Sequence, residues 1–139
     1  MHSSSSLVQI LKKNKLSLTK PRESVFKFLA TNQKPLTIKE IALGIQNVDR
    51  ASVYRTVELF ENLGIIKKVH VGFKYKVELS DIFQPHHHHI YCTQCGQTFA
   101  FEEPEFFEKY IERLGQKFEV EIKDHSFELE GICKSCKNN

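Results

Sequence analysis

Long apolar segments are missing from this 139-residue sequence. No apolar run approaches the roughly 20 residues that a membrane-spanning helix needs, so we expect no membrane partner. Residues 1–11 hold four serines but no continuous apolar stretch, and they do not predict a signal peptide. We therefore expect a cytoplasmic protein. Internal repeats and low-complexity linkers are also absent, and the length suits one ordinary domain or two small ones.

Acidic residues are scarce in the first part of the chain. Residues 1–80 contain 14 lysines and arginines but only 6 aspartates and glutamates, a net charge of +8. Residues 81–139 contain 6 basic and 11 acidic residues, a net charge of −5. A basic segment suits a polyanion such as double-stranded DNA, and an acidic segment does not. The alternative is that this uneven charge is only solvated surface.

The composition changes near residues 80–85. Basic amphipathic segments precede this point, whereas all four cysteines and five of the seven histidines follow it. We predict two domains, with residues 1–80 binding DNA and residues 81–139 binding metal. The predicted fold class is α+β.

Helical periodicity dominates the first domain. Apolar residues recur at helical spacing in residues 25–29 and again after Thr37, which forms a predicted capping box with Glu40. Another helix is predicted over residues 51–63, because its apolar residues share one face and Gly64 is suited to end it.

Two β-like runs, residues 65–71 and 73–79, follow these helices and flank Gly72. The second run alternates apolar and charged residues, which predicts a half-buried strand whose inner side chains are Phe73, Tyr75, Val77 and Leu79. Three helices followed by a β-hairpin are the order of a winged helix-turn-helix.

The side of the 51–63 helix opposite its apolar stripe is polar. A recognition helix presents such groups to base edges and phosphates, and an arginine can bind guanine with two hydrogen bonds. We therefore expect DNA contacts from Ser52, Tyr54, Arg55 and Thr56. Lysines on the hairpin commonly protect an edge strand, but here we expect phosphate contacts from Lys74 and its neighbours Lys67, Lys68 and Lys76.

The second domain alternates short strands with one helix. Strands are predicted at residues 90–92 and 98–101 and a helix at 104–114, while residues 118–122 and 127–131 also alternate in polarity. We expect a small antiparallel sheet beside the helix.

Two Cys-x-x-Cys pairs stand in this domain, Cys92 with Cys95 and Cys133 with Cys136. In a reducing compartment they do not predict disulfides. Two such pairs complete the tetrahedral four-thiolate site of structural Zn²⁺, and a redox dithiol or an iron–sulfur cluster is the alternative. This site leaves no open coordination position, and a His-Glu-x-x-His motif is absent. We therefore expect neither an enzyme nor a small-molecule substrate.

Four consecutive histidines directly precede the predicted strand at 90–92. An extended chain points alternate side chains to opposite faces, so His86 and His88 face one way and His87 and His89 the other. The run can therefore supply two separate metal sites, unless it is only a purification tag. The candidates for the remaining ligands are Glu78, Asp81, Glu108 and His125.

Taken together, these motifs resemble the ferric uptake regulator (Fur) family from about residue 11 to residue 136. The matching segments, in chain order, are Thr19-Lys20-Pro21-Arg22, Ala51-Ser52-Val53-Tyr54-Arg55-Thr56-Val57, Leu63-Gly64-Ile65-Ile66, the histidine run with Cys92-x2-Cys95-Gly96, and Asp124-His125 with Gly131-x-Cys133-x2-Cys136. The resemblance implies a homodimeric repressor that binds a palindromic operator when a regulatory metal is bound. Residues 81–139 would be its dimerisation domain.

The resemblance also implies roles for individual residues. Tyr54 and Arg55 fall on DNA-contacting positions of the family, and the four cysteines fall on its structural zinc site. The hinge sensor site would consist of Glu78, His87 and His89, with Asp81 as an alternative to Glu78. A further site in the dimerisation domain would consist of His86, His88, Glu108 and His125.

Two departures from the family pattern bear on the metal. Iron- and peroxide-sensing members often have a hinge histidine before the second helix of the DNA-binding domain, but residues 34–37 contain none, and His70 is the candidate substitute. Iron-responsive members often have aspartate where this chain has His88, and nitrogen ligands favour Zn²⁺ over Fe²⁺ or Mn²⁺. The hinge cysteine of some zinc regulators is absent.

We therefore expect structural Zn²⁺ and a regulatory divalent metal, most readily Zn²⁺, in a regulator of metal uptake or homeostasis genes. The alternatives are an iron-responsive or peroxide-sensing regulator of the same family, or a constitutive zinc-ribbon module that binds DNA or another protein.

Overall fold

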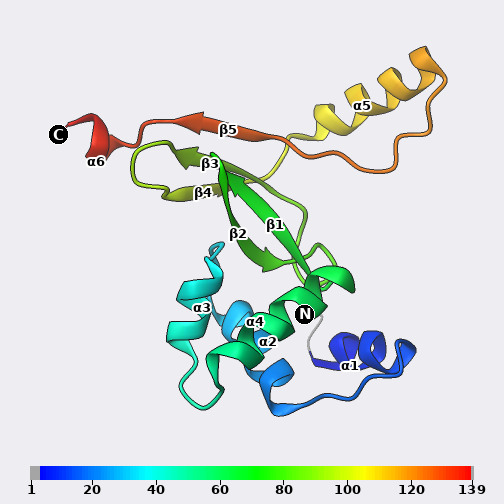
Figure 1. Cartoon of the computed structure of the whole chain (residues 1–139). Coiled ribbons are helices and arrows are strands. Elements are labelled where there is room, and N and C mark those ends of the chain that lie inside the picture. The colour runs from blue at the N-terminus through cyan, green and yellow to red at the C-terminus, as the bar shows by residue number, and fades with distance from the viewer. Residues whose placement is uncertain (1–3, 139) are drawn as a thin grey trace. The chain divides into compact units, whose positions relative to one another are not determined.

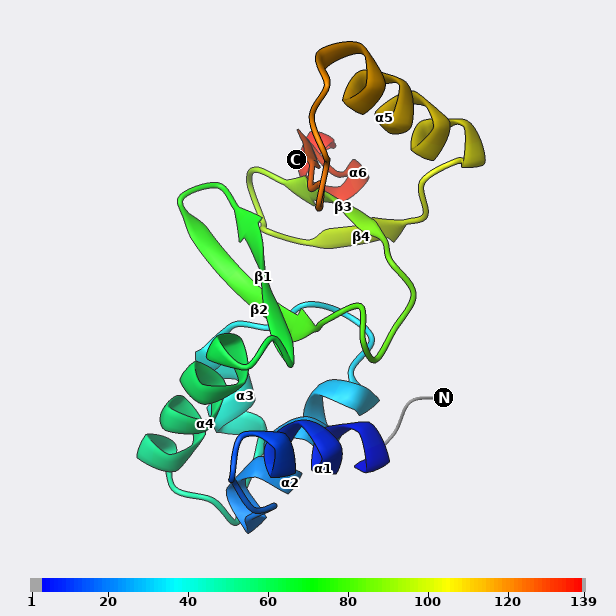
Figure 2. The same ribbon diagram turned by 90° about the vertical axis from the view of Figure 1, so that its right-hand side faces the viewer.

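The structure is a computed structural model that describes residues 4–138. The chain divides into two compact units, Met1–Pro85 and His86–Asn139. The first unit is helical with one β-hairpin, and the second holds a three-stranded sheet and one long helix (Figure 1, Figure 2). This mixture confirms the predicted α+β class. In the described part of the chain, no helix has the length and apolar character to cross a membrane.

Four helices and a hairpin follow one another in the first unit, and the last three helices with the hairpin have the order of a winged helix-turn-helix. The helices are α1 (Ser4–Lys13), α2 (Lys20–Thr31), α3 (Ile38–Gly44) and α4 (Arg50–Asn62). The hairpin pairs β1 (Ile66–Val71) with β2 (Lys74–Leu79) in antiparallel register. Helices α2, α3 and α4 pack on one another, and α4 leads directly into the hairpin.

Side-chain caps set the starts of α3 and α4. The predicted capping box is confirmed, because the Thr37 hydroxyl accepts from the Glu40 amide and the Glu40 carboxylate accepts from the Thr37 amide. The Asp49 carboxylate caps α4 by accepting from the amide of Ser52 at 3.1 Å. This cap starts the helix one residue before the predicted Ala51.

One apolar core holds the first unit together. It combines the inner faces of the helices with the base of the hairpin, and its fully buried members are Leu7, Leu11, Val25, Ile41, Val53, Val57, Phe60, Ile65 and Val77. The burial predicted for the inner side chains of β2 is confirmed only for Val77 and Leu79. Phe73 and Tyr75 lie beyond the edge of the core and are exposed.

The second unit contains β3 (His88–Cys92), β4 (Thr98–Phe101), α5 (Glu105–Phe118), β5 (Glu128–Gly131) and α6 (Lys134–Lys137). Its sheet has the strand order β4-β3-β5, with β4 antiparallel and β5 parallel to β3. The expectation of an antiparallel sheet was therefore wrong for β5. The connection from β4 through α5 is long enough to return the chain in the same direction as β3.

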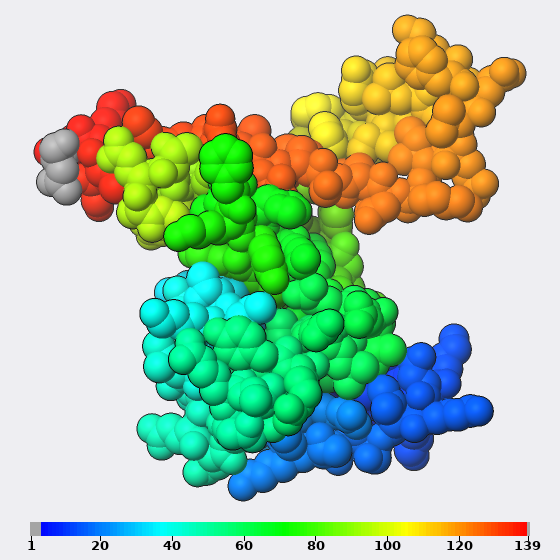
Figure 3. Space-filling model, viewed as in Figure 1, coloured from blue at the N-terminus to red at the C-terminus, as the bar shows by residue number. Residues whose placement is uncertain are grey.

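Residues 118–122 do not form the strand that their alternation suggested. Phe118 is the last residue of α5, and Glu119 takes a left-handed conformation (φ 54°) that ends the helix. The chain then folds back on α5, and the Val120 amide donates to the Gly115 carbonyl at 2.9 Å. The yellow-to-orange lobe in Figure 3 contains α5 and this returning segment.

The second unit has few buried apolar side chains. Among its described residues, the buried side chains are His88, His89 and Cys92, all of them predicted metal ligands. Many of its large apolar side chains are exposed instead, namely Ile90, Phe99, Phe106, Tyr110, Phe118, Val120, Ile122, Leu129 and Ile132. Such a small apolar core contributes little to the stability of this unit.

Candidate metal centres and DNA-binding surface

Four cysteines from two distant parts of the chain converge in the second unit. Cys92 ends β3 and Cys95 lies in the turn after it, while Cys133 directly precedes α6 and Cys136 lies within it. Parallel pairing with β5 places Cys92 opposite Gly131, close to Cys133 in the chain. The four Sγ atoms lie within 4.8 Å of one another, with 3.7 Å between those of Cys95 and Cys133. Four thiolates at about 2.3 Å from Zn²⁺ lie roughly 3.8 Å apart, so this donor set fits a structural zinc ion.

The thiols of this cluster differ in acidity. The backbone amide of Cys133, 3.3 Å from the Cys92 Sγ, and that of Cys95 lower the pKa of the Cys92 thiol to about 6. A hydrogen bond with the Cys133 thiol raises the pKa of Cys136 to about 12. At neutral pH Cys92 is thus a thiolate, whereas Cys136 must release its proton when a metal binds. The zinc affinity of the site consequently rises with pH.

Three imidazoles and one carboxylate form a second cluster in the same unit. His88 is the first residue of β3 and His86 lies two residues before it, while Glu103 lies in the segment before α5 and His125 in the segment before β5. The Glu103 Oε2 atom lies 2.7 Å from Nε2 of His88 and 2.8 Å from Nε2 of His125, and the Nε2 atoms of His86 and His125 are 3.1 Å apart. Ligands at about 2.0–2.1 Å from a tetrahedral Zn²⁺ are roughly 3.3 Å apart, so these four donors also fit such an ion.

The carboxylate of this cluster is Glu103, whereas Glu108 was expected. The first turns of α5 present Phe107 to the cluster, with its ring centroid 5.9 Å from that of His125 and 6.5 Å from that of His88. Glu108 lies about 100° further round the helix and is exposed. Glu103 precedes the helix, which leaves its carboxylate free to turn toward the imidazoles.

Burial and hydrogen bonding act in opposite directions on Glu103. Burial on its own would raise the pKa of the Glu103 carboxyl, but hydrogen bonds from His88 and His125 outweigh this effect and lower the pKa below its ordinary value. The carboxylate therefore stays ionised to a lower pH than that of a free glutamate. It is a charged oxygen ligand across the neutral range.

The other two histidines of the run form a separate pair. The rings of His87 and His89 have centroids 4.8 Å apart, and His89 is buried. The acidic residues expected to join them belong to the first unit. There Glu78 is buried on β2 with its carboxylate 3.8 Å from the Lys67 ammonium, whereas Asp81 is more exposed and pairs with Lys67 at 2.8 Å. His70 lies exposed on β1.

Helix α4 presents part of the predicted DNA-contacting set. Tyr54 and Arg55 are exposed, and the Arg55 Nη2 donates to the Ser52 hydroxyl at 3.1 Å, which holds the guanidinium near the start of the helix. The structure contradicts the expectation for Thr56, which is 6% exposed because it shares a face with the core residue Val53.

Arg50 was not among the DNA-contacting candidates from the sequence. It lies at the start of α4, with its guanidinium carbon 5.7 Å from the centroid of the Tyr54 ring. Asp49 could have indicated this position from the sequence, because a capping aspartate places the next residue, Arg50, in the first turn of the helix.

The hairpin lysines differ in their surroundings. Lys67 forms ion pairs with Glu78 and Asp81, and Lys68 forms one with Glu61 at 3.6 Å. Lys74 is exposed at the far end of the hairpin. Of the three, Lys74 is best placed to meet an external phosphate.

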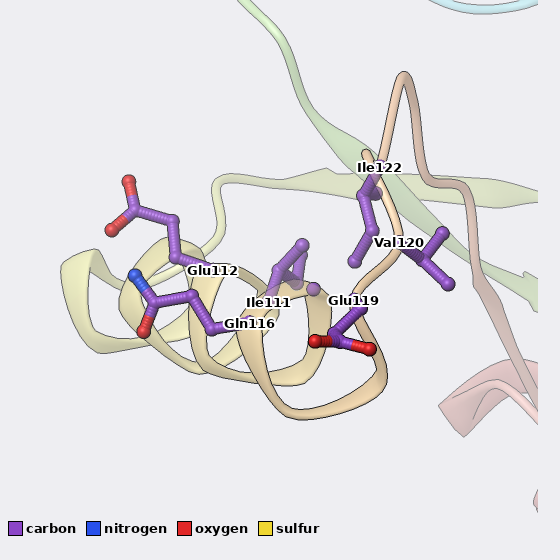
Figure 4. A pocket seen from close by; sticks show the side chains of 7 residues that line it. Ile111, Glu112, Gln116, Glu119, Val120 and Ile122 are labelled. Atoms are coloured by element: carbon purple, nitrogen blue, oxygen red, sulfur yellow. The ribbon is translucent and has the colours of Figure 1, made fainter.

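A shallow pocket lies apart from these clusters, between the end of α5 and the segment that folds back on it. Figure 4 shows Ile111 of α5 with Val120 and Ile122 across from it. None of the clustered histidines or cysteines lines this pocket. Its apolar lining continues the exposed apolar surface of the second unit.

Similarity to known proteins extends over nearly the whole chain. The profile of the ferric uptake regulator family matches residues 13–130. The peroxide-responsive repressor of Staphylococcus saprophyticus is 28% identical over 133 residues, which cover 92% of this chain and 87% of that protein.

Solved structures show the same fold. The ferric uptake regulator of Helicobacter pylori, described as having three functional metal-binding sites, has a TM-score of 0.80 and 28% identity over 96% of this chain and 90% of that one. The ferric uptake regulator of Francisella tularensis, solved with iron, has a TM-score of 0.73 and 29% identity over 88% and 95% of the two chains.

Proposed function

Because this chain belongs to the ferric uptake regulator family, we propose that it is a repressor that binds operator DNA when zinc occupies its regulatory sites. Members of the family are metal-responsive transcription regulators that bind DNA as homodimers, and they are not enzymes. The proposed targets are genes of metal uptake or homeostasis. The winged helix-turn-helix of the first unit and the ligand clusters of the second support this role.

The preference for zinc rests on the cluster of His86, His88, Glu103 and His125. It offers three imidazole nitrogens and one carboxylate oxygen, with the closest donor atoms 2.7–3.1 Å apart. Four donors at this spacing suit a tetrahedral ion, whereas Mn²⁺ prefers six oxygen-rich ligands. The bound metal would supply positive charge that neutralises Glu103 and fixes the three imidazole rings.

We propose that Glu78, His87 and His89 form the hinge site. Glu78 is the better candidate than Asp81, because Asp81 already forms the shorter ion pair with Lys67. The ring of Phe83 packs edge-on against Phe26 of the first unit, with centroids 5.0 Å apart. The first unit is thus still packed at Phe83, three positions before the histidine run begins at His86. Ligands on both sides of this short connection would make DNA binding depend on metal.

In the proposed complex, α4 enters the major groove. Arg55 and Tyr54 reach base edges or phosphates from its first turns, Ser52 orients Arg55, and Lys74 on the hairpin binds a phosphate. A second copy of the chain covers exposed apolar residues of the second unit. The resulting two-fold symmetry suits a palindromic operator.

Iron or peroxide sensing is the second candidate, and one observation favours it. The peroxide-responsive repressor of Staphylococcus saprophyticus is 28% identical over most of its length. Against it stands the nitrogen-rich donor set of the His86 cluster, which offers one carboxylate. A constitutive zinc-ribbon module would not need any of the histidine ligands.

An experiment that decides between these functions starts from protein whose regulatory sites have been emptied of metal. One metal at a time is then added, and operator binding is measured. We expect Zn²⁺ to restore binding to a selected operator duplex at a free concentration at least about tenfold below that needed for Mn²⁺ or Fe²⁺, in line with the Irving–Williams order and the imidazole ligands. Fluorescence anisotropy under anaerobic, metal-buffered conditions measures this. Activation by Fe²⁺ at the lowest concentration, with loss of binding on adding peroxide, would identify a peroxide sensor instead. Binding that ignores chelation would identify a constitutive module.

A further inference from the structure

The outer part of the β1–β2 hairpin carries an aromatic and basic surface. Five of its exposed side chains, here called the wing tip, are those of Lys68, His70, Phe73, Lys74 and Tyr75. None of them is acidic. In the part of the chain that the structure describes, Phe73 is the most exposed of the large apolar side chains. Its phenyl ring is therefore fully available to a ligand.

A tight turn holds Phe73 in this position. Val71 pairs with Lys74, so Gly72 and Phe73 form a two-residue hairpin turn. Gly72 has a φ of +65°, as the first position of a type II′ turn requires, and Phe73 occupies the second position. The ring thus projects from the end of a paired hairpin and not from a loose loop.

The alternation of apolar residues in β2 extends beyond the part of the strand that packs on the core. Val77 and Leu79 are buried in the first unit, but Tyr75 and Phe73, next in the same alternation, have no core to enter. Basic residues are the neighbours of these two rings in place of apolar side chains. The Lys68 ammonium lies 4.4 Å from the centroid of the Tyr75 ring, His70 is the cross-strand partner of Tyr75, and Lys74 follows Phe73. Isolated exposed apolar residues are common, but an exposed aromatic side chain followed by a lysine at a hairpin tip suits a polyanion with an apolar interior.

We propose that Phe73 is a wedge that enters the minor groove of the operator, while Lys74 binds a phosphate beside it. This inference rests on the proposed DNA-binding function and extends it to a new contact. The major groove, about 12 Å wide, accommodates α4, whereas the minor groove, about 6 Å wide, admits a side chain but not a two-stranded ribbon. Apolar side chains that enter the minor groove partly unstack a base step and bend the duplex.

The test uses the full-length, zinc-loaded protein and a duplex that the wild type selects from random-sequence DNA. 2-Aminopurine, which brightens when its base unstacks, is placed in turn at each step flanking the selected core. Phe73→Ala removes the wedge, Phe73→Leu keeps an apolar one, and Lys74→Ala removes a charge. Leu43→Ala is the matched control, because Leu43 is also an exposed apolar residue of the first unit but lies on α3.

We expect Phe73→Ala to weaken binding about 5- to 20-fold and to remove the 2-aminopurine signal that the wild type gives at one flanking step. Phe73→Leu and Leu43→Ala retain most of the affinity. In Phe73→Ala the slope of log affinity against log salt concentration stays as in the wild type, because no charge is lost. In Lys74→Ala the magnitude of this slope falls by about one.

Wild-type affinity and an unchanged 2-aminopurine signal in Phe73→Ala would overturn the wedge and leave the repressor function intact. A changed oligomeric state of Phe73→Ala in sedimentation would overturn it in favour of a contact between copies of the chain. If the zinc-loaded wild type selects no DNA, the proposed function fails, and the wedge fails with it.

Discussion

Replacing both Cys92 and Cys133 with serine is expected to abolish zinc retention and to unfold the second unit while the first unit stays folded. Residues 86–138 bury few apolar side chains of their own, and Cys92 is one of them. Binding of structural Zn²⁺ contributes an apparent 10–16 kcal/mol in small zinc domains, about as much as the total stability of an ordinary domain. The first unit has its own apolar core and does not draw on the zinc site.

Native mass spectrometry and two-dimensional NMR together measure this outcome. The double variant should lack the zinc that resists mild chelation, and its resonances from residues 86–138 should collapse to the narrow dispersion of an unfolded chain. Ser135→Ala is the matched control, because Ser135 lies between two zinc ligands but is exposed and is not itself a ligand. A double variant with wild-type dispersion throughout would mean that the second unit folds without zinc.

Glu103→Gln is expected to weaken the second metal site by at least about 100-fold, while Glu108→Gln leaves it unchanged. Loss of a residue that only supports a ligand typically costs 10–100-fold in metal affinity, and Glu103 is placed here as a ligand itself. Its carboxylate lies within 2.8 Å of two of the imidazole nitrogens, whereas Glu108 is exposed on α5. Glutamine keeps the size of the side chain but removes the negative charge.

Competition with a chromophoric chelator measures the zinc affinities of both variants after the cysteine site has been filled. The two substitutions are chemically identical and five positions apart, so they separate the observed ligand set from the one that the family resemblance implied. The reverse result, with zinc affinity lowered in Glu108→Gln and normal in Glu103→Gln, would show that Glu108 and not Glu103 is the ligand.

Local signals in the sequence were sufficient for much of the first unit. Thr37 and Glu40 specify a capping box by themselves, and Gly64, with φ +72°, ends α4 as expected. The order of helices and hairpin follows from short-range patterns of polarity and from turn residues. The four cysteines were also recognisable, because two pairs with fixed spacing already define a tetrahedral donor set.

Other features depend on contacts that no local pattern contains. The choice between Glu103 and Glu108 depends on the rotational phase of α5, which Phe107 sets by packing near His88 and His125. Thr56 looks like a surface residue by composition, but the rotation of α4 buries it.

The pairing of strands in the second unit is likewise non-local. The parallel pairing of β5 with β3 depends on how the chain returns after α5, and the alternation in residues 118–122 resembles a strand only until Glu119 ends the helix and reverses the chain.

We propose that the hinge ligands make DNA binding depend on zinc. The most direct measurement compares operator affinity with and without regulatory zinc for the wild type and for the double variant His87→Ala/His89→Ala. The wild type should bind roughly 5- to 150-fold more tightly with zinc, the range of a typical coupling free energy. The double variant should bind with the affinity of the metal-free wild type under both conditions, while it retains its four-cysteine zinc. If the variant gains as much affinity from zinc as the wild type does, the hinge site has no role and the account is wrong.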